Sequence, residues 1–201
     1  MIDDGIVAYV DLHSTGDAVL SKCLELEDGR VTLPNVVKDS NRMYRLSEIG
    51  DMAFKDVGDL QSIRAPSNLR AIGYKAFSEN DSLEEVLLNN ELEYIGKFAF
   101  IGCKSLRSLE IPDSIIDIGE GSFMMTGLRT IAFPDKMVIT GKEIIAFTEV
   151  EDLWIPEGIT DIRQLMSASE YLRKICISES FDLKSLSGCF PRLKRIAVRD
   201  D

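Results

Sequence analysis

Short stretches along this chain alternate apolar and polar residues and then end in a turn. In the stretch 106–112, Leu109 and Ile111 are apolar, Glu110 between them is charged, and Pro112 follows. A spacing of two places Leu109 and Ile111 on one face of a strand and Glu110 on the other. A proline at the strand end does little harm, because no further N–H group is needed there. The pattern predicts a short strand with one buried and one exposed face.

The same pattern recurs at a regular interval. Positions equivalent to Pro112 fall at 66, 89, 112, 134, 156 and 178, which are separated by 23, 23, 22, 22 and 22 residues; Asn89 and Ser178 replace proline at two of them. A second marker, Ile-Gly followed by two residues and then Ala-Phe or Ser-Phe, starts at 49, 72, 95 and 118. A period of about 20–29 residues predicts a solenoid of the leucine-rich class, in which each unit buries its apolar face against the next.

The repeat also predicts the core on the side opposite the strands. The aromatic residues expected to stack there, in a short helical turn of each repeat, are Phe54, Phe77, Phe100, Phe123 and Phe147. With Phe147 in this column, the stretch from Gly141 carries two extra residues, and the unit at 162–174 lacks the aromatic residue. We interpret these weaker units as terminal repeats that face water.

The first residues do not follow the repeat and predict a cap. Residues 5–12 and 18–26 have the composition of two strands, and turn residues at 14–17 join them. Such a hairpin would cover the open edge of the first repeat. We therefore predict an N-terminal β-hairpin cap over 1–30 and one leucine-rich-repeat solenoid over 31–201. The expected fold class is α/β but β-rich, a right-handed solenoid of about six to seven repeats of 22–23 residues.

The most complete unit carries a family resemblance. Residues 95–112 read Ile-Gly-x-x-Ala-Phe-x-x-Cys-x-x-Leu-x-x-Leu-x-Ile-Pro. This unit resembles the treponemal-type, or BspA-like, leucine-rich repeat, and the resemblance extends over about 31–198. It implies a bacterial cell-surface or secreted protein that binds host proteins or other cells. The motif consists of core positions, so it names no partner. Only this unit has a cysteine, Cys103, at the Cys station, and we do not expect that column to bind metal or act in redox chemistry.

Charge and composition narrow the function further. The 201 residues carry a net charge of −11, which argues against nucleic-acid binding because the phosphate backbone would be repelled. No run reaches the roughly 18 apolar residues that a membrane-spanning helix needs. The start, from Met1 to Gly5, lacks the regions of a signal peptide. If Met1 is the native start, the expected location is the cytoplasm; the resemblance implies the cell surface or secretion.

Residues suited to catalysis or metal binding are scarce. The chain has one histidine, His13, beside a turn, and its four cysteines have no short paired spacing. A zinc site needs clustered Cys and His ligands, and a catalytic triad would have to use His13. Adjacent carboxylates such as Glu84 and Glu85 point to opposite faces of a strand. We therefore expect no enzyme activity, no metal and no cofactor.

The outward strand positions predict a binding surface. One column of outward residues consists of Arg64, Leu87, Glu110, Ala132, Trp154, Cys176 and Ala197, and the column two residues earlier consists of Ser62, Glu85, Ser108, Thr130, Asp152, Lys174 and Arg195. Around the single tryptophan the first column is apolar, where an exposed strand would normally carry charge. Tryptophan beside arginine and other charges is typical of binding hot spots. The alternative is that another segment or a second molecule covers Trp154.

Three functions are compatible with these patterns. The first is a non-enzymatic module that binds a protein, such as a host or surface protein, through its strand face. The second is a glycan or small-ligand binder that uses Trp154 as a stacking platform beside Asp152 and Glu110. The third is an inert structural or adhesin-like spacer. The candidate partner-binding residues are Trp154, Asp152, Glu110, Thr130, Lys174, Cys176 and Arg195.

Overall fold

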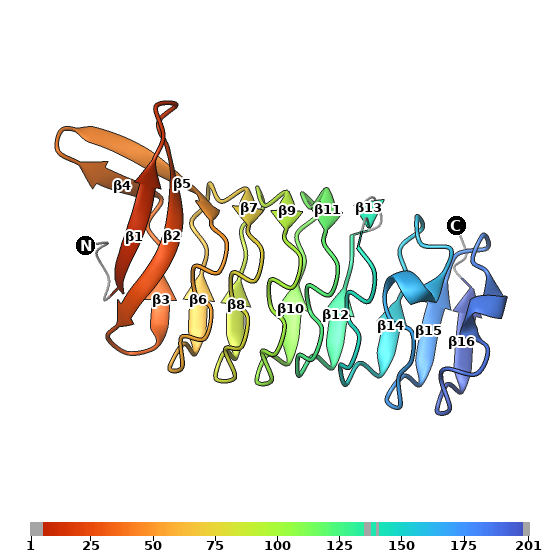
Figure 1. Ribbon diagram of the computed structural model, residues 1–201. Helices are drawn as coiled ribbons and strands as arrows, with labels where there is room; N and C mark the ends of the chain where they lie inside the picture. Colours follow the sequence, from red (N-terminus) through yellow and green to blue (C-terminus); the bar gives the residue numbers. More distant parts are fainter. Residues whose placement is uncertain (1–5, 135–137, 140, 199–201) are drawn as a thin grey trace.

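The chain forms a β-solenoid with two rows of parallel strands (Figure 1). The computed structural model describes residues 6–134, 138–139 and 141–198. The strands of the first row are β3 (Arg30–Thr32), β6 (Ser62–Arg64), β8 (Glu85–Leu87), β10 (Ser108–Glu110), β12 (Thr130–Ala132), β14 (Asp152–Trp154), β15 (Lys174–Ile177) and β16 (Arg195–Val198). They pair in parallel as β3-β6-β8, β10-β12 and β14-β15-β16, with equivalent repeat positions opposite each other.

The second row contains the Ile-Gly marker. Its solenoid strands are β5 (Arg42–Ile49), β7 (Ala71–Ile72), β9 (Tyr94–Ile95), β11 (Asp117–Ile118) and β13 (Val138–Ile139). Each pairs in parallel with the next, so Ile49, Ile72, Ile95 and Ile118 follow one another in the core. The solenoid predicted from the 22–23-residue period is confirmed.

The prediction of a short helical turn after the Ile-Gly marker is wrong. Within the described ranges the helices are two short 3₁₀ segments, η1 (Ile162–Gln164) and η2 (Leu183–Leu186). Around the aromatic residues, backbone N–H groups bond to the next repeat: Phe77 N donates to Ala99 O at 2.8 Å, and Phe100 N donates to Ser122 O at 2.7 Å. A helix would need those N–H groups for carbonyls four residues back in the same segment. The contribution of helix to the α/β fold is therefore small.

Four of the five predicted aromatic residues stack in the core. The ring centroids lie 5.2 Å apart for Phe54–Phe77, 5.0 Å for Phe77–Phe100 and 5.5 Å for Phe100–Phe123, and all three pairs are stacked. Phe147 does not continue the column, because its side chain is 76% exposed. Ile145 is fully buried in its place, since Phe123 N donates to Ile144 O in the same register as in earlier repeats. Gly141, Ile144 and Ile145 thus match the marker, and the unit has no extra residues there.

A row of buried polar side chains runs beside the aromatic column. Asn80 and Cys103 both donate to the backbone carbonyl of Phe77, at 2.8 and 3.1 Å. Thr126 donates to the carbonyl of Phe123 and Thr148 to that of Ile145, each at 2.8 Å. These carbonyls lie inside the protein, where an unpaired acceptor would be costly. In these four repeats the Cys station holds a hydrogen-bond donor, which need not be a thiol, whereas the first repeat has Val57 there.

Two hairpins stand at the N-terminal end (Figure 1). β1 (Ile6–Leu12) and β2 (Asp17–Leu26) pair antiparallel, and β2 continues in parallel to β5. The second hairpin joins β4 (Val36–Asp39) to β5 and was not anticipated from the sequence. Its residues lie within the range 31–201, which the sequence analysis assigned to the solenoid. Ala18, Leu20 and Leu46 are fully buried where the hairpins meet the first repeat.

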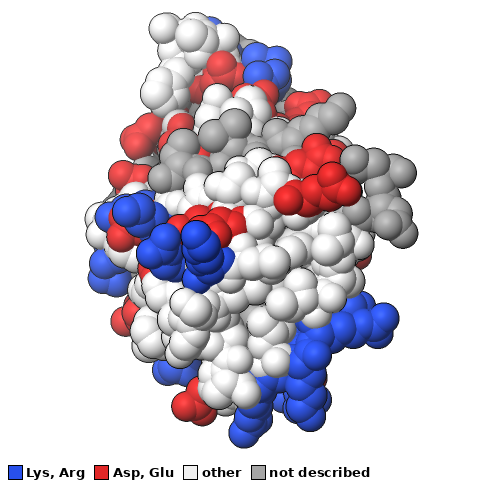
Figure 2. All heavy atoms as spheres, turned by 90° about the vertical axis from the view of Figure 1, so that its right-hand side faces the viewer, with Lys and Arg blue, Asp and Glu red and all other residues white. Residues whose placement is uncertain are grey.

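The opposite end of the solenoid is more open. Figure 2 views that end and shows uncharged side chains across its middle, with basic side chains gathered at its margins. Leu183, Ile196 and Val198 are 56%, 47% and 56% exposed, although their counterparts one repeat earlier, Ile162, Ile175 and Ile177, are buried. The last described repeat therefore keeps the apolar pattern of the core, but at these positions its side chains are exposed.

Candidate functional site

The strand pairing of β14, β15 and β16 aligns five of the seven candidate residues. Asp152 lies opposite Lys174, which lies opposite Arg195 on the following strand. In the next outward row, Trp154 lies opposite Cys176. Neighbouring strands are about 4.8 Å apart, so these side chains form two adjacent rows on one surface. The alternation predicted from the sequence thus brings these residues together.

The backbone beneath these rows is firmly held. Leu153, Ile155 and Ile175 point inward and are buried, and Ile155 N donates to Cys176 O at 2.9 Å. Trp154 points outward between them and is 44% exposed. Since buried strand positions fix the backbone on both sides, the indole is carried on a rigid element rather than on a loop.

Thr130 and Glu110 belong to the neighbouring strands β12 and β10. Ser108 lies opposite Thr130, and Glu110 lies opposite Ala132. Glu151 N donates to Arg129 O, which continues the same register into β14 and places Ala132 beside Trp154. Glu110 is therefore two strands from Trp154, about 10 Å along the sheet. A ligand stacked on Trp154 would need to span that distance to reach Glu110.

Ion pairs border the strand face, and the sequence analysis missed them. Glu149 lies 3.3 Å from Arg107 and 3.0 Å from Arg129, and Arg173 lies 3.1 Å from Glu151. Each of these residues precedes a strand, where successive repeats place side chains next to each other. A comparison of charges at equal repeat positions would have found Arg173 with Glu151. It would not have found the pairs of Glu149, because Glu149 lies at a different repeat position from Arg107 and Arg129.

The described residues show no arrangement suited to metal binding. No group of three or more His, Cys, Asp or Glu residues among them is placed to hold a metal ion. The four cysteines are free, and burial raises the pKa of Cys103 to about 12 and that of Cys23 to about 11. A thiol with so high a pKa is almost entirely protonated near neutral pH, so Cys23 and Cys103 lack the thiolate that nucleophilic chemistry needs.

The repeat geometry matches a known family. A family model described as "BspA type Leucine rich repeat region" matches residues 47–173 in six copies. The chain belongs to this family. Among curated proteins, none matches the chain. The family assignment confirms the resemblance carried by residues 95–112, and its six copies fall within the two rows of strands described above.

Solved structures of bacterial leucine-rich repeat proteins share the fold. The Treponema pallidum leucine-rich repeat protein superposes with a TM-score of 0.70 at 21% identity, covering 94% of this chain and 78% of the other. A leucine-rich repeat protein from Bacteroides ovatus gives a TM-score of 0.65 at 18% identity, covering 99% and 76%. One from Bacteroides capillosus gives 0.58 at 26% identity, covering 64% and 97%. The structures from Treponema pallidum and Bacteroides ovatus have low sequence identity to this chain, so they show only that the fold is shared.

The family and the fold leave the binding partner open. The BspA-type repeat consists mainly of core positions, whereas Trp154 and its neighbours point outward. None of the helices in the described part of the chain is long and apolar enough to cross a membrane.

Proposed function

We propose that this BspA-type protein is a non-enzymatic module that binds a partner protein at the cell surface or after secretion, through its strand face. The observation that carries the proposal is the half-exposed Trp154 on a rigid parallel sheet. Large aromatic residues provide much of the binding energy at protein interfaces, because they bury a wide area at low entropic cost.

The surroundings of Trp154 support a protein partner. Ala132 and Cys176, on either side of Trp154, are small, and nearly half of the Trp154 surface is exposed. The row beside it holds one acidic residue, Asp152, and two basic residues, Lys174 and Arg195, with Lys174 in the middle. An apolar centre with a charged border is the usual composition of an interface, in which the border favours one partner over another.

The glycan alternative uses the same tryptophan but fewer neighbours. Stacking on Trp154 with hydrogen bonds from Asp152 remains compatible with the alignment. Glu110 would contribute only to an extended glycan, because Ala132 lies between it and Trp154. The spacer alternative predicts that no residue of the strand face affects binding.

The test is a selection from a displayed library of bacterial and host protein fragments, with a glycan array in parallel. The wild-type chain and Trp154→Ala are compared on every ligand recovered. We expect Trp154→Ala to lower the affinity for protein ligands by about tenfold or more, the usual effect at a hot spot. Thermal unfolding verifies that the variant is folded.

The matched control is Tyr94→Ala. Tyr94 is 46% exposed, close to the value for Trp154, but it lies on β9 in the other row of strands. Tyr94→Ala should retain binding. If both variants lost binding equally, or if Trp154→Ala bound its ligands as well as the wild type, the strand face would not be the binding surface. If only glycans were recovered as ligands, the glycan hypothesis would be favoured.

A further inference from the structure

A hollow of about 580 Å³ opens between the last three described repeats, and none of its lining residues belongs to the rows around Trp154. Its lining comes from residues 147–148, 168–171 and 188–189, together with Pro191. A volume of this size lies within the range of about 300–1,000 Å³ that small-ligand sites occupy. Ser169 N donates to Cys189 O at 3.2 Å, which joins two of the contributing repeats.

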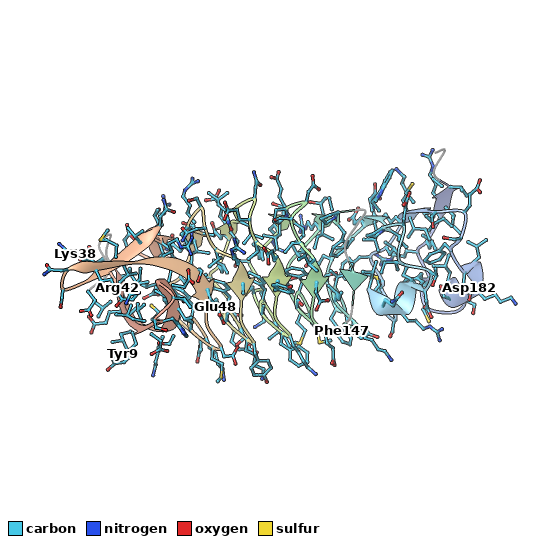
Figure 3. All side chains as sticks on the ribbon, turned by 90° about the horizontal axis from the view of Figure 1, so that it is seen from above. Tyr9, Lys38, Arg42, Glu48, Phe147 and Asp182 are labelled. Atoms are coloured by element: carbon cyan, nitrogen blue, oxygen red, sulfur yellow. The ribbon has the colours of Figure 1, made fainter. Side chains whose placement is uncertain are left out.

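Phe147 is an unusual residue for its position. It has a φ of +58°, in the left-handed region that bulky side chains rarely adopt, and it is 76% exposed. The residues at the same position in earlier repeats are Asp56, Glu79, Gly102 and Met125. A phenylalanine there accepts both backbone strain and an exposed apolar surface. The positive φ is shared by this position in all five repeats, so the unusual feature is the exposed aromatic ring, which points to binding rather than to stability. Figure 3 shows Phe147 projecting outward from the solenoid.

A second aromatic ring and a carboxylate complete the site. Tyr171 lines the same hollow and is exposed, and no ring pair among the described residues joins it to Phe147. Gly188, on the wall, has open space where a side chain would stand. Glu170 lies beside Tyr171, and none of the ion pairs found in the described ranges includes it. The two rings therefore line one hollow without covering each other, next to a negative charge.

We propose that this hollow binds an organic cation, an ammonium group carried on an apolar body. The faces of Phe147 and Tyr171 attract a cation electrostatically, and the Glu170 carboxylate adds an opposite charge. Arg163, on the repeat that precedes η2, forms an ion pair with Asp161, which balances its positive charge. The ligand is either a free quaternary ammonium compound or a lysine side chain of a partner, and both present the same chemistry.

The test is an NMR titration of the full chain with hydroxyphenyl-trimethylammonium and with tert-butylphenol. These two probes have nearly the same shape, and only the first is charged. We expect shifts of backbone amides at 147–148, 168–171 and 188–189, and an affinity for the cation about threefold to tenfold above that for the neutral probe. Similar affinities for the two probes would overturn the proposal, as would shifts elsewhere or none up to the solubility limit.

Two variants separate the contributions of the ring and the charge. Phe147→Gly should lose most of the affinity for the cation and keep its melting temperature, because glycine adopts a positive φ freely. Glu170→Gln should lower cation affinity severalfold and leave the neutral probe unchanged. Met125→Gly is the control, since Met125 has the same φ of +58° but does not line the hollow. Equal losses in Phe147→Gly and Met125→Gly would contradict the assignment.

A second titration, with short peptides, distinguishes the two sources of the cation. An acetylated and amidated Ala-Lys-Ala peptide is compared with the same peptide carrying norleucine. Shifts in the hollow with the lysine peptide alone indicate a protein partner, and shifts with the quaternary ammonium probe alone indicate a free ligand. Both results support a cation site. Failure of this site leaves the proposal for Trp154 unaffected, because the variants at Trp154 and Phe147 are tested with different ligands.

Discussion

At the scale of single residues, the aromatic column shows what a repeat position requires. Phe54, Phe77, Phe100 and Phe123 are almost fully buried and stack on one another, whereas Phe147 lies outside. The side chain is placed by its distance from the preceding glycine, not by being aromatic. Isoleucine therefore fills the same position in the next repeat, and a phenylalanine two residues later is exposed.

Phe100→Ala tests the contribution of this column to stability. Phe100 stacks on both neighbours, so its removal leaves a cavity that the rigid repeats on either side cannot close. We expect a loss of about 3–5 kcal/mol in the free energy of unfolding, measured by urea denaturation. Phe147→Ala is the control and should change stability by less than about 0.5 kcal/mol, as exposed positions do. A similar loss in both variants would mean that the column does not dominate the core.

At the scale of the elements, the backbones of neighbouring repeats lie so close together that the turns after the second row of strands require glycine. A Cβ atom added at Gly96 would lie 2.6 Å from the carbonyl carbon of Gly73, and one at Gly119 would lie 2.6 Å from Lys97 N. Real Cβ atoms do not approach backbone atoms so closely. The glycine of the Ile-Gly marker is therefore required by the spacing between repeats rather than by a left-handed φ.

Gly96→Ala is expected to destabilise the protein by about 1–3 kcal/mol, because the methyl group must push two repeats apart. Urea denaturation provides the measurement. Gly58→Ala is the matched control, since a Cβ there meets no atom within 4 Å. It should be neutral or stabilising by up to about 1 kcal/mol, through a smaller entropy of the unfolded chain. If Gly96→Ala proved as stable as Gly58→Ala, the repeats would have to be more adaptable than their contacts indicate.

At the scale of the whole molecule, contacts between neighbouring repeats dominate. Ion pairs such as Arg70–Glu93, Lys97–Glu120 and Arg173–Glu151 join adjacent repeats, but they lie on the surface and contribute little. Burial is complete in the middle of the solenoid and decreases in the last repeat, at Leu183, Ile196 and Val198. In a solenoid each repeat is stabilised mainly by its neighbours, so stability should fall toward the last described repeat, where these apolar side chains are exposed.

Hydrogen exchange provides the test of this gradient. Amides of β16 and η2 are expected to exchange faster than those of β9 and β11, because the last repeat can open without disturbing the others. The amides of β2 should remain protected, since that strand bonds to β5 and packs over the first repeat. Equal protection from β2 to β16 would instead mean that the solenoid unfolds as one cooperative unit.

The sequence by itself determined the solenoid, its period and the side of each strand that faces the core. These follow from local spacing, because alternation assigns the faces of a strand and a period of 22–23 residues assigns the stacking. The same reasoning aligned Trp154 with Cys176, and Asp152 with Lys174 and Arg195. Whether that face binds a partner stays a proposal.

Only the tertiary structure decided which residues fill the core positions where the repeats differ in length. The exchange of Phe147 for Ile145 and the hollow beside Tyr171 both depend on contacts between neighbouring repeats. A single stretch of sequence cannot specify them, because backbone hydrogen bonds from one repeat to the next set the register. Phe147 illustrates both levels: its sequence pattern predicted a core residue, and the register placed it on the surface.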